Sequence, residues 1–183
     1  AGVKTKIGPI VILLAAWMMG SALHELGTAA LISKLATETS SLALLPALTF
    51  LTGAAISFST GTSWGTMGLL FPLAIPAAAG MGAVDHFLAI IVAAVFSGAV
   101  FGDHCSPFSD TTIVTSISCG VEPHDHVRTQ IPYAVITAGV AIVVGFLPAG
   151  LGAPGYVSLL VGAIVLLMVP RLKKGTDLLK NNR

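Results

Sequence analysis

Charge is scarce in this chain of 183 residues, of which only 9% are Asp, Glu, Lys or Arg. Soluble domains carry about 25% charged residues, and a water-soluble fold of this size cannot cover its surface with so few. Together with the 55% share of hydrophobic residues, this excludes a disordered chain, a coiled coil and a nucleic-acid-binding protein. The composition therefore predicts a polytopic α-helical membrane protein surrounded by a lipid bilayer.

Cysteine is almost absent as well. Cys105 and Cys119 are too few for a disulfide framework, which excludes a small secreted scaffold. Both lie near apolar helix, where we expect them to act as small core residues. The chain begins with Ala1 and shows no signal-peptide pattern, because the first apolar run is too long. We therefore expect a fragment, or a chain whose upstream half is missing.

Long apolar runs recur along the chain and are separated by short polar segments. They cover residues 7–23, 42–58, 67–79, 87–101, 131–147 and 156–169. Runs of this length are typical of membrane-spanning helices. A basic tail, 171–183, follows the last run, so we expect a membrane domain at 1–170 and a cytoplasmic tail.

The positive charges predict the orientation of these helices, because Lys and Arg concentrate on the cytoplasmic side of a membrane. With the tail in the cytoplasm, eight of the nine Lys and Arg residues face that side, and only Lys34 does not. We expect a multi-pass protein of the prokaryotic plasma (inner) membrane with a cytoplasmic C-terminus. The same count holds whether 42–79 forms two full spans or a re-entrant hairpin.

The most polar interruption of an apolar run lies at residues 102–112 and contains Asp103 and Asp110. An aspartate near the bilayer centre costs about 2.5–3.5 kcal/mol, so the pair costs on the order of 5–7 kcal/mol unless compensated. The alternative without a function is a kinked helix whose aspartates cap a helix end or extend toward the membrane surface. Two aspartates, a histidine and several hydroxyls in eleven residues are denser than a kink needs, which favours a functional site.

Pro107 predicts how this interruption folds. Proline has no N–H, so it leaves the carbonyl of Asp103 without its helical donor, and it forces Ser106 toward extended geometry. Ser106 is also a good N-cap, and proline is favoured as the first residue of a helix. We therefore expect one helix to end near Asp103 and another to start at Pro107. The gap would offer carboxylates, hydroxyls and free carbonyls, a set of hard oxygen ligands suited to Na⁺ or a proton.

A second interruption, at residues 59–66, contains glycine and hydroxyl residues but no aliphatic side chain. Glycine permits close backbone approach, and the hydroxyls could coordinate an ion or line a pore. Thr62 or Ser63 could cap the helix that follows. An ordinary polar turn between two full spans is the alternative, with Trp64 as an interfacial anchor.

Other polar residues give weaker signals. His24-Glu25 would need a second histidine at position 28 to match a zinc protease, and Thr28 stands there; an interfacial helix end is the simpler interpretation. The segment 118–129 could bind a metal or sense pH, although we favour a solvated cytoplasmic loop. Its polar residues are Glu122, His124, Asp125, His126 and Arg128. An intramembrane metalloenzyme using these histidines with His104 and Cys105 would lack an established ligand spacing.

The interruption at 102–112, Gly-Asp-His-Cys-Ser-Pro-Phe-Ser-Asp-Thr-Thr, resembles the signature of the NhaC-type Na⁺/H⁺ antiporter family. Residues 57–66, 25–29 and 126–134 are similar to other segments of that family, in the same order and at the same spacing. The resemblance covers about positions 2–150.

This resemblance implies the fold of the wider ion-transporter superfamily, in which inverted repeats each carry a re-entrant hairpin and an unwound helix. By that analogy, 42–79 is a hairpin with its tip at 60–64, and 86–118 is the broken helix, beside about four transmembrane helices. Family members are more than twice this long, which implies that 1–170 is a C-terminal half. The missing N-terminal half, a second subunit or a homodimer could complete its site.

We expect a secondary active transporter, not an enzyme, that exchanges Na⁺ or another monovalent cation for H⁺, with no cofactor beyond these transported ions. Asp103 and Asp110 would accept the proton and transiently bind Na⁺, and His104 would tune the pH response. Neutral oxygens would come from Ser106, Ser109, Thr111, Thr60, Thr62 and Ser63. The helix breaks would lie at Gly61, Gly102 and Pro107.

Two other functions stay open at this stage. A Na⁺-coupled exchanger of organic acids or amino acids would keep the same fold, with Trp64, Arg128 or the missing half holding the organic anion. A non-transporting structural membrane subunit would not need Asp103 at all.

Overall fold

The structure is a computed structural model that describes residues 18, 41–107 and 109–180, without the side chains of 110, 117 and 169–180. Apart from Met18, the predicted first span at 7–23 lies outside the described residues, as do the His24-Glu25 pair, Lys34 and the segment 25–29.

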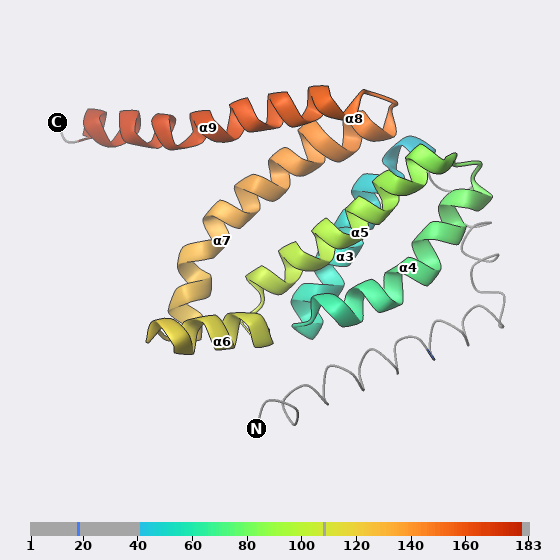
Figure 1. The fold of residues 1–183 in the computed structure, drawn as a ribbon. Helices are drawn as coiled ribbons and strands as arrows, with labels where there is room; N and C mark the ends of the chain where they lie inside the picture. The colour runs from blue at the N-terminus through green and yellow to red at the C-terminus, as the bar shows by residue number, and fades with distance from the viewer. Residues whose placement is uncertain (1–17, 19–40, 108, 181–183) are drawn as a thin grey trace.

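The described residues fold into helices and contain no strand (Figure 1), which confirms the predicted all-α class for this part of the chain. In chain order the elements are the 3₁₀-helix η1 (Leu42–Leu44), α3 (Leu45–Thr60), α4 (Ser63–Gly80), α5 (Asp85–Cys105), α6 (Asp110–Cys119), α7 (Pro123–Val140), the π-helix η2 (Ala141–Phe146), α8 (Leu147–Gly150) and α9 (Gly155–Lys180).

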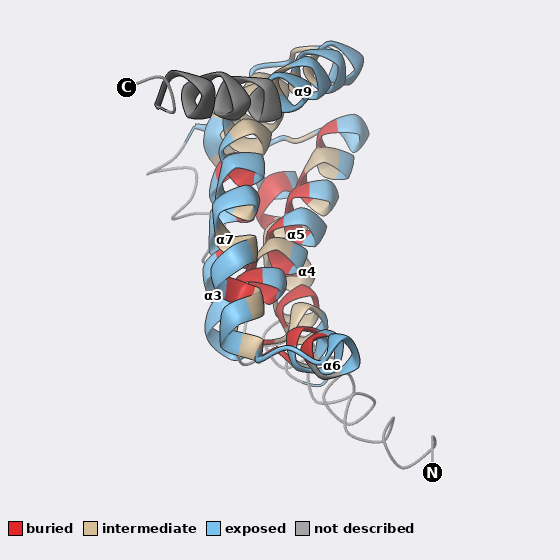
Figure 2. Cartoon of the chain, turned by 90° about the vertical axis from the view of Figure 1, so that its left-hand side faces the viewer, coloured by how far each residue is buried: buried red, intermediate tan, exposed pale blue. Residues whose placement is uncertain are grey.

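Helix α5 is the centre of the core and packs against both α3 and α4. Its side chains Ile91, Val95 and Ala99 are fully buried. Val95 and Ala99 cluster with Met67 and Leu70 of α4. Figure 2 shows the buried residues concentrated on these three helices, while residues 155–168 of α9 are largely exposed. The helices that carry the two interruptions therefore form the most tightly packed part of the described chain.

Two glycines let α3 and α5 approach closely. A Cβ added to Gly98 would collide with the main chain of Phe50, and one added to Gly102 would collide with the carbonyl of Ala54. The Cβ added to Gly102 would also lie 2.7 Å from the backbone nitrogen of Phe58. Small residues spaced four apart allow this backbone-to-backbone contact between membrane helices.

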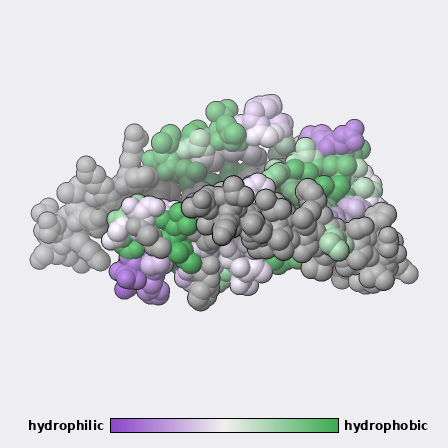
Figure 3. Space-filling view, turned by 60° about the horizontal axis from the view of Figure 1, so that its bottom comes forward, coloured by the Kyte–Doolittle hydropathy of each residue, from purple (hydrophilic) through white to green (hydrophobic). Residues whose placement is uncertain are grey.

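Three described helical segments are long and apolar enough to cross a membrane: Leu42–Thr60, Asp85–Cys105 and Pro123–Gly150. The helix at Gly155–Met168 is apolar but shorter. Figure 3 shows hydrophobic side chains over much of the described part of one face, with hydrophilic groups gathered in small areas. Exposed apolar surface of this extent is expected where lipid is the solvent. Whether α3 and α4 cross the membrane or form a re-entrant hairpin stays a prediction.

The long helix Pro123–Gly150 is not α-helical throughout, because residues Ala141–Phe146 form a π-helix. Phe146 in this segment packs against Phe50 of α3, with ring centroids 5.3 Å apart. Segments of π-helix are rare and lie mostly as single turns inside α-helices. The sequence pattern of 131–147 gave no sign of this segment.

Candidate ion site at the interrupted helix

The break between α5 and α6 lies within the predicted interruption at 102–112. Gly102, predicted as a helix break, lies inside α5 instead, where its missing side chain allows the close contact with α3. α5 ends at Cys105, and Ser106 has extended backbone angles, φ −79° and ψ 125°, as expected before a proline. The predicted restart at Pro107 is wrong, because α6 begins three residues later, at Asp110.

Ser109, and not Ser106, accepts the first hydrogen bonds of α6. The Ser109 hydroxyl accepts from the backbone N–H of Thr112 at 3.4 Å, and its carbonyl accepts from Ile113 at 3.0 Å. The predicted N-cap at Ser106 is therefore corrected to Ser109. The carbonyl of Asp103 is not free either, because the Ser106 N–H donates to it at 3.2 Å. A shortened last turn of α5 thus replaces the donor that Pro107 lacks.

Asp103, in the last turn of α5, is 3% exposed and is held by two hydroxyls from beyond the break. Ser109 donates to its Oδ1 at 2.8 Å, and Thr111 donates to its Oδ2 at 2.8 Å. The two hydroxyl oxygens lie 2.7 Å from each other. The break therefore brings four oxygen atoms together, two from the buried carboxyl group and two from hydroxyls.

Counting hydrogens shows what this cluster can bind. Three short oxygen–oxygen contacts need three hydrogens, and the two hydroxyls supply one each. A proton on Asp103 supplies the third. Without that proton, two oxygen atoms face each other through lone pairs at one of the contacts, and a cation among the oxygens would relieve this repulsion. The arrangement thus matches a group that holds either a proton or a cation.

The turn between α3 and α4 lies at the same end of the molecule as the break (Figures 1 and 2). Gly61 ends α3 in the left-handed conformation, φ 67°, and its N–H donates to the carbonyl of Ser57 at 2.8 Å. Thr62 caps α4 by accepting from the Gly65 N–H at 3.3 Å, as predicted. Ser57, in the last turn of α3, packs on Gly102, so the end of α3 that leads into the turn lies against the end of α5 that leads into the break.

Hydroxyls near this turn donate mainly to the main chain of their own helices. Ser59 donates to the carbonyl of Ala55 and Thr60 to that of Ile56, each at 2.8 Å. Trp64 is 63% exposed. The proposed roles of Thr60, Thr62 and Ser63 as cation ligands stay predictions.

The second predicted carboxylate, Asp110, is the first residue of α6. Its side chain lies outside the described part of the structure. Its pairing with Asp103 stays a prediction.

Ser57 is the residue of this region that the sequence analysis missed. Its side chain is fully buried, and among the described residues its hydroxyl has no hydrogen-bond partner. Leaving a buried hydroxyl unpaired costs about 1–3 kcal/mol, so this position needs an explanation.

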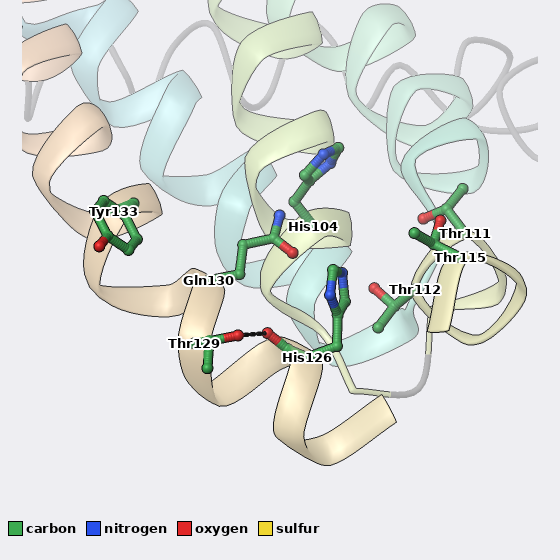
Figure 4. Close-up of a pocket in the computed structure, with 8 residues that line it drawn as sticks. All are labelled: His104, Thr111, Thr112, Thr115, His126, Thr129, Gln130 and Tyr133. Carbon is green, nitrogen blue, oxygen red and sulfur yellow. Dashed lines mark hydrogen bonds between the residues drawn. The ribbon is translucent and has the colours of Figure 1, made fainter. Parts of the chain in front are cut away.

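A cavity of about 490 Å³ lies beside the break, between the end of α5, α6 and the start of α7 (Figure 4). Each of its lining side chains carries a hydrogen-bonding group. They are His104, Thr111, Thr112, Thr115, His126, Thr129, Gln130 and Tyr133. Thr111 both lines the cavity and donates to Asp103, so the cavity and the carboxyl cluster share a wall.

Two expectations about polar residues need correction. The segment 118–129 is not a loop throughout, because α7 begins at Pro123 and places His126, half-buried, on the cavity wall. Proline at the first position of a helix explains this start. Cys105 is buried as expected, but Cys119 is exposed at the end of α6. Among the side chains that the structure describes, no three His, Cys, Asp or Glu residues lie close enough together to hold a metal ion.

A polytopic helical protein with a buried carboxylate at an interrupted membrane helix has the architecture of a secondary transporter. The model of the Na⁺/H⁺ antiporter family matches residues 1–151. The chain therefore belongs to the Na⁺/H⁺ antiporter family, which confirms the resemblance found in the sequence.

Similar proteins include several antiporters. An uncharacterized protein of Haemophilus influenzae is 41% identical over 170 residues, which cover 91% of this chain and 32% of the relative. The Na⁺/H⁺ antiporter NhaC of Alkalihalophilus pseudofirmus is 32% identical over 79% of this chain and 31% of its own length. The malate-2H⁺/Na⁺-lactate antiporter of Bacillus subtilis is 41% identical over 52% of this chain and 20% of its own length. The chain spans at most about a third of these relatives, and no solved structure matches it.

Proposed function

We propose that the full-length protein exchanges Na⁺, or another monovalent cation, for H⁺, and that Asp103 binds both ions in turn. The observation that carries this proposal is the buried Asp103 carboxyl group, held at a helix break by the hydroxyls of Ser109 and Thr111. Membership of the Na⁺/H⁺ antiporter family supports the choice of ions.

Exchange follows from competition for the same oxygen atoms. A proton on Asp103 completes the ring of hydrogen bonds with Ser109 and Thr111, whereas a cation needs the carboxylate in its ionised form. Binding of one ion therefore displaces the other. If the site reorients across the membrane only when occupied, this competition alone couples the two fluxes.

The bilayer would be a prokaryotic plasma membrane, with the C-terminus in the cytoplasm and the turn between α3 and α4 entering from outside. The distribution of Lys and Arg supports this orientation. Residues 1–170 would form one half of an inverted-repeat transporter, with α3 and α4 as its re-entrant hairpin. The other half, or a second subunit, would complete the pathway.

Replacement of Asp103 by asparagine tests the exchange directly. In the full-length protein reconstituted in vesicles, we expect Asp103→Asn to abolish Na⁺-dependent proton movement, because an amide cannot exchange a proton for a cation. Asp85→Asn is the matched control, since Asp85 lies exposed in the first turn of the same helix. A pH-sensitive dye inside the vesicles gives the rate. Wild-type rates in Asp103→Asn would contradict the proposal and would fit a structural subunit.

The cavity beside the break, whose lining side chains carry hydrogen-bonding groups, favours a second candidate, a Na⁺-coupled exchanger of small organic acids or amino acids. Its volume of about 490 Å³ is in the range of small-molecule sites, and bare cations do not need such a space. The relatives named as a malate-2H⁺/Na⁺-lactate antiporter and an arginine/ornithine antiporter support this alternative. Stimulation of Na⁺ flux by malate, lactate or arginine would favour it over simple exchange.

A further inference from the structure

Ser57 stands out among the hydroxyl residues near the end of α3. Ser59 and Thr60 are exposed and donate to main-chain carbonyls one turn earlier. Ser57 is fully buried, and its hydroxyl has no partner among the described residues. A serine in a helix can satisfy its hydroxyl by donating to a carbonyl four residues back, and Ser57 does not use this option.

Ser57 lies against the residue that precedes the carboxylate. A Cβ added to Gly102 would lie 2.8 Å from the Cβ of Ser57, and Gly102 is followed directly by Asp103. Because the main chains of α3 and α5 are in contact here, position 102 has no space for a side chain larger than that of glycine. The unpaired hydroxyl therefore lies at the contact between α3 and α5, beside the residue that precedes Asp103 in the chain.

We infer that the Oγ atom of Ser57 is a ligand of the transported cation, contributed by α3 to the oxygen atoms of Asp103, Ser109 and Thr111. This inference rests on the proposed cation exchange. Hard cations are bound by several oxygen atoms, and neutral oxygens lower the net charge that must be buried. A hydroxyl that is buried and has no partner among the described residues gains one when the cation binds.

Unfolding measurements with and without Na⁺ distinguish a ligand from a structural residue. The full-length protein in detergent would be compared as wild type, Ser57→Ala and Ser59→Ala, with NaCl replaced by choline chloride at constant ionic strength. A ligand that binds the folded state raises the unfolding temperature with increasing concentration. The same variants in vesicles give the Na⁺ concentration for half-maximal proton movement.

For Ser57→Ala we expect an unfolding temperature in choline chloride at least as high as that of the wild type, because an unsatisfied buried hydroxyl is removed. We also expect the half-saturating Na⁺ concentration to rise about tenfold or more. Ser59→Ala should match the wild type in both measurements. Equal half-saturation in Ser57→Ala and the wild type would overturn the role of Ser57, as would a lower unfolding temperature without Na⁺.

Ser57→Cys provides a second variant that keeps the shape of the side chain. Sulfur is a soft ligand that suits hard cations poorly, so we expect the same loss of Na⁺ affinity as in Ser57→Ala. Wild-type Na⁺ affinity in Ser57→Cys would overturn the inference even if Ser57→Ala fails to fold. A wild-type protein that does not respond to Na⁺ at all would instead overturn the proposed exchange, and the role of Ser57 with it.

Discussion

The two interruptions of the described helices look alike in sequence and differ in what their hydroxyls contact. At the turn between α3 and α4, the hydroxyls of Ser59 and Thr60 donate to carbonyls of their own helix. At the break between α5 and α6, the hydroxyls of Ser109 and Thr111 donate to the Asp103 carboxyl group. The hydroxyls of the first interruption are therefore bound to main-chain carbonyls, whereas those of the second are bound to the ionisable side chain of Asp103.

This difference shows that a high content of serine, threonine and glycine does not by itself define an ion site. The turn needs glycine and hydroxyls to reverse the chain direction, as Gly61 and Thr62 show. The break uses similar residues to surround a charge that would otherwise be costly in a membrane. The contact of Ser57 with Gly102 joins the ends of α3 and α5 that lead into these two interruptions.

The largest loss of stability is expected at the close contact between α3 and α5. Gly102→Ala would drive a methyl group into the main chain of Ala54 and Phe58. We expect the unfolding free energy to fall by about 3 kcal/mol or more, since backbone cannot move aside as a side chain can. Denaturant or thermal unfolding of the full-length protein in detergent measures this loss.

Gly139→Ala is the matched control, because a Cβ at Gly139 in α7 would meet no atom within 4 Å. We expect this variant to be unchanged or more stable by about 0.5–1 kcal/mol, since alanine is the better helix former. Equal destabilisation in both variants would show that the close contact between α3 and α5 does not determine the loss of unfolding free energy in Gly102→Ala.

The next effect concerns the hydroxyls of the break. We expect the double variant Ser109→Ala, Thr111→Val to raise the Na⁺ concentration for half-maximal proton movement about tenfold, because a hydrogen bond to a charged group is worth about 1.5–3 kcal/mol. Ser118→Ala is the control, because the exposed Ser118 donates only to the carbonyl of Val114. Transport in vesicles at varied Na⁺ measures the shift.

Thr60→Val extends this measurement to the turn between α3 and α4. It tests whether the hydroxyls of the turn and of the break differ in function. If the two interruptions differ as their hydrogen bonds indicate, Thr60→Val shifts the half-saturating Na⁺ concentration less than the double variant does. An equal shift would show that Thr60 also binds the cation, as the sequence alone predicted.

The smallest effect is expected at the cap of α4. Thr62→Ala removes the oxygen that accepts from the Gly65 N–H and should lower the unfolding free energy by about 1 kcal/mol. Thr62→Ser keeps the oxygen and should remain close to the wild type. A loss in Thr62→Ala that exceeds the loss in Gly102→Ala would reverse the expected ranking of local and interhelical contacts.

The sequence was sufficient for features that depend on neighbouring residues. Pro107 and the extended Ser106 are local consequences of proline geometry, and the interruption lies where they predict it. Local rules could not decide whether Ser106 or Ser109 caps α6, because both residues are serines. Ser109 also contacts the carboxyl group of Asp103, six residues earlier, and local rules contain no such contact.

Contacts between helices were harder to predict than the helices themselves. The role of Ser57 depends on where α3 crosses α5, and no spacing within 42–58 specifies that point. A signal was present in α5, where Gly98 and Gly102 form a small-x-x-x-small pair of the kind that brings membrane helices together. It marks the contact face of α5 but does not say which helix packs there. The cavity residue His126 was assigned to a solvated loop because Pro123 was not recognised as the start of a helix.

The glycine contact between α3 and α5 also limits how the molecule can move. Helices separated by flexible side chains can slide past each other, whereas helices whose main chains touch at Gly98 and Gly102 must first separate. If the protein exchanges ions as proposed, a motion that presents Asp103 first to one side of the membrane and then to the other would carry α3 and α5 together. The sliding surfaces of such a motion would then lie around this pair and not between its two helices.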